Sequence, residues 1–75
     1  MSHLSIISGK DLCKILKKIG YVEDHQTGSH IIMRNKNYPF RRLSIPNHKE
    51  IAKGTLRTII RQAGLSLNEY NKLLK

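Results

Sequence analysis

The chain has 75 residues, with 14 Lys and Arg against 5 Asp and Glu and a formal net charge of +9. This length predicts one domain over residues 1–75, too small to enclose a large substrate cavity, and the positive charge favours a nucleic acid or an acidic protein as partner. Because no apolar run could span a membrane or form the core of a secretory signal, we expect a cytoplasmic protein with no membrane partner.

A first helix is predicted to begin after Ser8. Asp11 follows this serine at the spacing of a capping box, which satisfies the free N–H groups of a helix start. Apolar residues then recur at intervals of three and four, lysines occupy the opposite side, and Gly20 is a natural end. The single cysteine, Cys13, lies inside this helix. We interpret it as a small apolar filler, because it cannot form an internal disulfide.

Three short strands are predicted over residues 21–45, where the helical period disappears. β-branched or aromatic residues gather at residues 21–22, 31–33 and 43–45, with turn-forming residues between them. Gly28 and Ser29 would make the first turn, residues 35–39 the second, and Pro46 would end the last strand. The strands would form an antiparallel meander.

Two further helices are predicted after a loop at residues 46–50. Leu56, Ile59 and Ile60 share one face of a helical pattern that stops at Gly64, and a second capping box at residues 66–69 starts a short terminal helix. The order is α-β-β-β-α plus a short α. It predicts an α+β fold with helices on one face of a three-stranded antiparallel sheet, as in the double-stranded RNA-binding domain. Order alone does not establish function.

His30 is the principal candidate for chemistry, because it follows the first predicted turn and would begin the middle strand. Metal-free RNA cleavage needs a base for the 2′-hydroxyl and an acid for the departing 5′-oxygen, and imidazole, with a usual pKa of about 6.5, can serve as either. The alternative is an ordinary surface histidine in a turn. His25 on the first strand and His48 in the loop after the last are competing candidates, whereas His3 is set aside near the N-terminus.

Six basic residues are candidates for contact with RNA phosphates. Three lie in the strand region and three at four-residue intervals on the second helix: Arg34, Arg41, Arg42, Lys53, Arg57 and Arg61. Guanidinium groups match phosphate oxygens and can stabilise the extra negative charge of a pentacoordinate phosphorus. The alternative is a set of ordinary solvated charges.

The remaining chemistry-bearing residues suggest no further site. The five acidic side chains are dispersed without metal-ligand spacing, so we expect no metal and no other cofactor. Among the aromatic residues we expect core or edge packing for Tyr21 and Phe40, while the role of Tyr38 stays open between packing and stacking on an unpaired base.

Three segments together resemble the HicA toxins over residues 8–64. They are Ser8-Gly9-Lys10-Asp11-Leu12, then Thr27-Gly28-Ser29-His30, then Ile45-Pro46-Asn47-His48 followed by Lys53-Gly54-Thr55-Leu56-Arg57 and Arg61-Gln62-Ala63-Gly64. The resemblance implies a double-stranded RNA-binding-like fold, cleavage of mRNA and neutralisation by a HicB-type antitoxin protein. It also implies that His30 occupies the family's catalytic position, supported by Gly28, Ser29 and His48, the last shaping either the RNA surface or its own loop.

The main hypothesis is therefore a ribonuclease toxin of a toxin-antitoxin system, in which His30 acts as base, acid or both. The alternative is a non-catalytic RNA-binding module of the same fold. A DNA-binding regulator with its recognition residues on the second helix is disfavoured, because that helix is short and no paired helix-turn-helix pattern precedes it. The toxin hypothesis implies an acidic partner that covers the basic surface and blocks His30.

Overall fold

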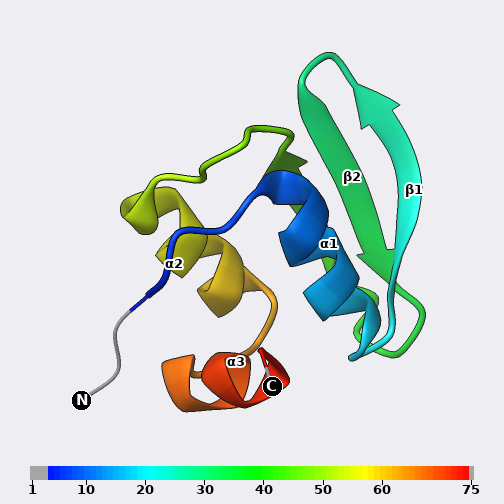
Figure 1. Ribbon diagram of the computed structural model, residues 1–75. Helices are drawn as coiled ribbons and strands as arrows, with labels where there is room; N and C mark the ends of the chain where they lie inside the picture. Colours follow the sequence, from blue (N-terminus) through cyan, green and yellow to red (C-terminus); the bar gives the residue numbers. More distant parts are fainter. Residues whose placement is uncertain (1–3, 75) are drawn as a thin grey trace.

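A computed structural model describes residues 4–74 and confirms the predicted order of elements (Figure 1). The helices and strands that it describes are α1 (Gly9–Lys17), β1 (Tyr21–Thr27), β2 (His30–Asn35), β3 (Arg42–Pro46), α2 (Lys53–Gln62) and α3 (Leu67–Leu73). The first helix ends before the expected stop at Gly20, and Ile19 packs against the core from the turn that follows.

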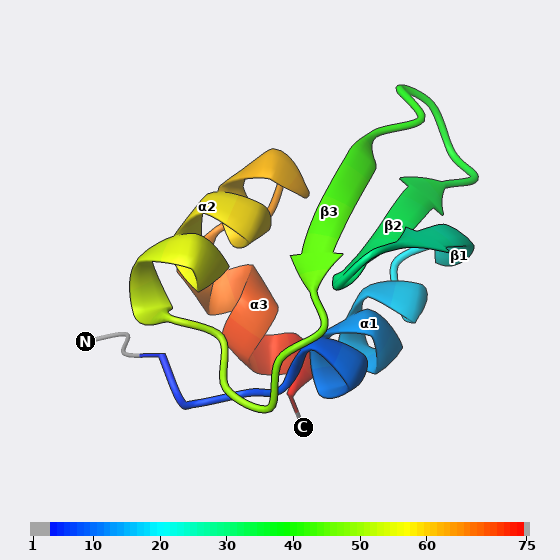
Figure 2. The ribbon, with the colours of Figure 1, turned by 90° about the horizontal axis from the view of Figure 1, so that it is seen from above.

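The three strands form an antiparallel sheet in the order β1-β2-β3, with the helices on one of its faces (Figure 2). Alternate residues of a strand point to opposite faces, and those that point toward the helices are buried: Ile31 and Met33 on β2, and Leu43 and Ile45 on β3. They join the apolar side chains of the helices in one core cluster. The expected α+β architecture is confirmed, and the opposite face of the sheet carries no helix among the described residues.

Gly28 and Ser29 form the predicted turn between β1 and β2. Thr27 pairs with His30, so the two residues between them make a two-residue hairpin loop. Gly28 has a φ of 53°, and a positive φ at the first position of such a loop is typical of a type II′ turn, which favours glycine there. This turn places His30 at the first position of β2.

The start of α1 is held by its cap and by close packing against the end of β3. The Ser8 hydroxyl accepts a hydrogen bond from the Asp11 amide at 3.1 Å, as the capping pattern predicts. Gly9 is buried, and a Cβ at this position would collide with the Pro46 carbonyl oxygen and approach the Asn47 Cα to 3.1 Å. Only glycine therefore lets the helix approach the strand this closely.

The terminal helix α3 begins with the predicted capping box. Ser66 accepts from the Glu69 amide at 3.1 Å, and the Glu69 carboxylate accepts from the Ser66 amide at 2.8 Å. Tyr70 buries its ring in the core, and the Lys18 ammonium donates to the Leu73 carbonyl at 2.8 Å. These contacts fasten the short helix to the rest of the fold.

The structure divides the aromatic residues differently from the prediction. Tyr21 is buried, as expected, but the expected packing of Phe40 is wrong: its side chain is 55% exposed. It lies in the loop between β2 and β3 with a φ of 60° and makes an edge-to-face contact with the exposed Tyr38 ring, 6.0 Å between centroids. The loop projects beyond the sheet, so neither ring reaches the core.

Candidate active site and nucleic-acid interface

The helix-free face of the sheet brings together His30, the competing candidate His25, and two of the six basic candidates, Arg34 and Arg42. On β2 the buried Ile31 and Met33 alternate with His30, Ile32 and Arg34, so these three side chains point away from the helices. We call this the uncovered face. The register places Ser44 beside Ile32 and Arg42 beside Arg34, which extends this face across β3.

His30 stands at the hairpin end of the uncovered face. It pairs with Thr27 on one side and Pro46 on the other, and the Asn47 amide donates to the Ser29 carbonyl at 2.7 Å, which ties the end of β3 to the turn. The position is therefore defined by neighbours on both sides. Its imidazole is exposed and has no hydrogen-bond partner within residues 4–74, so both ring nitrogens are accessible to a bound molecule.

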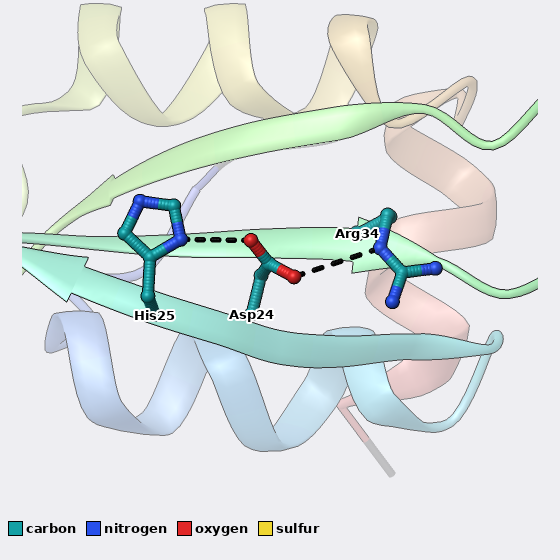
Figure 3. Close-up of polar contacts among 3 residues, drawn as sticks. All are labelled: Asp24, His25 and Arg34. Atoms are coloured by element: carbon teal, nitrogen blue, oxygen red, sulfur yellow. Dashed lines mark hydrogen bonds and ion pairs between the residues drawn. The ribbon is translucent and has the colours of Figure 1, made fainter.

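A β-bulge in β1 brings Asp24 and His25 to the same face. Glu23 pairs with Met33 and His25 with Ile32, so Asp24 is an extra residue in the strand. Figure 3 shows the consequence: the Asp24 and His25 side chains rise from β1 beside Arg34 of β2. His25 Nδ1 lies 2.7 Å from one Asp24 carboxylate oxygen, and Arg34 Nε lies 3.7 Å from the other.

The surroundings of Asp24 keep its carboxyl ionised. Its pKa is lowered, first by the hydrogen bond with His25 and further by the charges of His25, Arg42 and Arg34, although partial desolvation opposes them. An ionised carboxylate can only accept hydrogen bonds, so Nδ1 of His25 carries the proton that is shared with Asp24. The other ring nitrogen, Nε2, is left to exchange a proton elsewhere.

Two arginines of the uncovered face oppose each other directly. Arg34 and Arg42 are cross-strand partners, and like charges in that arrangement are unfavourable. Asp24 lies beside Arg34 and offsets part of the repulsion. The pair remains a concentration of positive charge, which a phosphate group would neutralise by accepting hydrogen bonds from both guanidinium groups.

Arg41 has a structural contact that its sequence position did not indicate. Its Nη1 donates to the Gln62 carbonyl at 3.3 Å, and its guanidinium lies against Gly64. A cation at the C-terminal carbonyls of a helix is favourable, so Arg41 stabilises the end of α2. It also lines an open pocket of about 530 Å³ between β3 and α2, together with Ile32, Arg42, Leu43, Ser44 and Gln62.

The basic residues of α2 form a second group. Lys53, Arg57 and Arg61 are exposed, and Arg57 and Arg61 line a pocket with Ile60, Leu65 and Leu67. This pocket shares no lining residue with the one beside Arg42. We call Arg34, Arg41 and Arg42 the sheet group and Lys53, Arg57 and Arg61 the helix group. Arg41 and Arg42 line the first pocket, and Arg57 and Arg61 line the second.

His48 and His3 are the two remaining histidines of the chain. His48 lies in the loop after β3, where its main-chain carbonyl accepts from the Gly9 amide at 2.9 Å while its side chain is exposed. Its backbone thus holds the loop against α1. His3 lies outside the described residues.

Residues 4–74 show neither a metal-ligand cluster nor a membrane-spanning helix. No three His, Cys, Asp or Glu side chains gather there as a potential metal site. No described helix is both long enough and apolar enough to cross a membrane.

Asp24 is the site residue that sequence reasoning missed. The signal for it was the polar run Glu23-Asp24-His25-Gln26, in which the alternation of a half-buried strand breaks down. A break of this kind marks a candidate bulge. Only the pairing with β2 shows that the extra residue is Asp24 and that it shares a face with Arg34.

Comparison with known proteins identifies a family for this chain. The family model described as the HicA toxin of bacterial toxin-antitoxin systems matches residues 9–65, about three quarters of the chain. A search of curated proteins found no match. The matched segment runs from α1 through α2 and includes the hairpin turn that places His30. On this match, the chain belongs to the HicA toxin family.

Proposed function

We propose that this HicA toxin is a metal-independent endoribonuclease that cleaves mRNA in the cytoplasm by general acid-base chemistry through His30, and that a HicB-type antitoxin neutralises it. The observation that carries the proposal is the exposed imidazole of His30 on the same face as the opposed pair Arg34 and Arg42. A proton-transfer group and a phosphate-binding group are the two functions that such a reaction requires.

The uncovered face suits an RNA strand better than a small substrate. Its arginines would hold the phosphate backbone and stabilise negative charge that develops on phosphorus, and the open pocket beside Arg42 leaves room for a nucleotide of the same strand. The helix group of Lys53, Arg57 and Arg61 would contact phosphates further along the strand. Binding would then come from many charges and cleavage from one site.

Metal independence is proposed from the composition of the site. Among the described residues the site has one carboxylate, Asp24, which is already engaged by His25 and Arg34, whereas two-metal nucleases hold their ions with several free carboxylates. Histidine can move protons near neutral pH without an ion.

An antitoxin would act by covering the same surface. The chain has a net charge of +9, so an acidic partner would be attracted to it, and a partner seated on the uncovered face would block His30.

Incubation of the purified protein with RNA in EDTA tests this function. Fragments should appear with 2′,3′-cyclic or 3′-phosphate ends, because the attacking group is the 2′-hydroxyl. The same RNA with deoxyribose at the cleaved position should stay intact. Fragments that form only with Mg²⁺ and carry 5′-phosphate ends would contradict the proposal, and binding without cleavage would favour an RNA-binding module.

A further inference from the structure

The proposed cleavage requires two proton transfers. One group must take the proton from the 2′-hydroxyl as its oxygen attacks phosphorus, while another gives a proton to the departing 5′-oxygen. His30 supplies one proton-transfer group at the hairpin end of the uncovered face. The second must lie on the same face, at a distance that leaves room for a phosphodiester between the two.

His25 meets that positional requirement. Thr27 lies opposite His30, and His25 is two residues away from Thr27 along β1, so the two histidines are diagonal neighbours across the hairpin. The Cα atoms of diagonal neighbours in an antiparallel pair lie about 7–8 Å apart. Two imidazole rings that rise from such positions leave room for a phosphate group hydrogen-bonded to both. The bulge at Asp24 is what turns His25 toward this face.

The groups around His25 orient its ring. Asp24 of β1 engages Nδ1 at 2.7 Å, and Arg34 of β2 engages the far oxygen of the same carboxylate at 3.7 Å. Within residues 4–74, the other charged or titratable groups on this side are Arg42 of β3 and His30 of β2. A ring anchored at Nδ1 presents Nε2 to a bound strand in a defined direction, as in other aspartate–histidine pairs.

We infer that His25, oriented by Asp24, is the proton donor to the departing 5′-oxygen and that His30 is the base, an inference that rests on the proposed ribonuclease function. The assignment follows from the neighbours of the two rings. When His25 is protonated, Asp24 balances its charge, whereas His30 has no carboxylate partner among the described residues. The neighbouring carboxylate therefore favours His25 over His30 as the position of the donor.

The reaction balances without a further reactant. His30 removes the 2′-hydroxyl proton, the 2′-oxygen forms a bond to phosphorus, and the bond from phosphorus to the 5′-oxygen breaks. The 5′-oxygen takes the Nε2 proton of His25, so the products are a 2′,3′-cyclic phosphate and a 5′-hydroxyl. His30 ends protonated and His25 neutral, and exchange with water restores both.

A sulfur substrate separates a proton donor from a residue with a structural role. A short RNA with one linkage that the wild-type protein cleaves is made in two forms, natural and with sulfur replacing the bridging 5′-oxygen. A thiolate leaves without protonation, so the sulfur form needs no acid. His25→Ala should slow single-turnover cleavage of the natural form by about 10²–10⁴-fold and of the sulfur form by less than about tenfold. His30→Ala should be slow on both.

The pH profile and a neighbouring variant complete the test. With the natural substrate, the wild-type rate should fall on both sides of its optimum, and His25→Ala should lose the fall on the alkaline side, where an acid is no longer protonated. Gln26→Ala is the matched control, because Gln26 pairs with Ile31 and faces the helix-covered side of the same strand. It should cleave both substrates at the wild-type rate.

The outcomes distinguish a failure of the inference about His25 from a failure of the proposed ribonuclease function. Wild-type cleavage of the natural substrate by folded His25→Ala would overturn the inference, and so would an equal loss on both substrates, which indicates a structural role. In either case His30 and the ribonuclease function would stand. A wild-type protein that cleaves no RNA would overturn the function and the inference together.

Discussion

The two histidines of the uncovered face differ in their neighbours. His25 is tied to Asp24 through Nδ1, while the ring of His30 is unengaged among the residues described. An engaged ring has a fixed direction, and an unengaged ring can adjust to a substrate. The difference supports separate tasks for two side chains of the same type.

Arg42 should be more important for binding than for folding. It opposes Arg34 directly, so Arg42→Gln should relieve repulsion and leave the free energy of unfolding unchanged or raised by about 0.2–1 kcal/mol. RNA affinity should fall, because a phosphate ligand is lost. Thermal melts and RNA titrations of the same protein measure both effects.

Lys72→Gln provides the comparison for Arg42→Gln, since Lys72 is an exposed cation on α3 outside the uncovered face. It changes the net charge equally and should weaken RNA binding less. A variant at Arg42 that melts well below the wild type and binds RNA normally would contradict the role given to this side chain.

At the scale of elements, the helix starts were predictable because their capping hydrogen bonds join residues that are close in the sequence. The caps at Ser8 and Ser66 involve residues three apart in the chain, and both formed as the sequence indicates. The turn at Gly28 is equally local. The position of His30 on the strand followed from this turn and was therefore predictable too.

What escaped prediction depends on contacts between elements. The bulge at Asp24 exists only in the pairing of β1 with β2, and the contact of Arg41 with α2 joins residues 21 positions apart. The exposure of Phe40 depends on where its loop projects. The spacing of residues in the sequence indicates the period of a single helix or strand. These features depend instead on how two elements are placed relative to each other.

The junction of α1 with β3 leads to a prediction about glycine. Gly9→Ala should destabilise the fold by about 1–3 kcal/mol, because the added Cβ collides with the Pro46 main chain and backbone must move. Chemical denaturation measures the change.

Gly54→Ala is the matched control for this junction. Gly54 is an exposed position of α2 with no atom near the added Cβ, so alanine there should stabilise the fold by about 0.5–1 kcal/mol through its helix propensity. Equal effects of the two substitutions would contradict the close approach of α1 to β3.

At the scale of the whole molecule, the net charge of +9 leads to predictions about RNA binding. Arg41 and Arg42 of the sheet group line one pocket, and Arg57 and Arg61 of the helix group line another. Because acidic residues are few, we expect a long polyanion to contact both groups at once. A short one would contact only one of them. Affinity should therefore depend on the length of the RNA.

Salt should weaken RNA binding steeply. Displaced counterions predict a log-log slope of about −0.7 for each phosphate contact on a single strand, so several contacts give a slope of several times that value. Fluorescence anisotropy of labelled RNA across a salt series measures it. An affinity independent of salt would contradict a phosphate-led interface, and tighter, sequence-specific binding of duplex DNA would favour a regulator.

The single-turnover cleavage rate of His30→Ala tests the central claim most directly. The substitution removes the exposed imidazole and leaves the core untouched, so the variant should keep its circular dichroism melt and nearly all its RNA affinity. Its cleavage rate should fall by about 10²–10⁴-fold, a barrier higher by about 3–5 kcal/mol. A folded variant that binds RNA and cleaves it at the wild-type rate would contradict the assignment of His30.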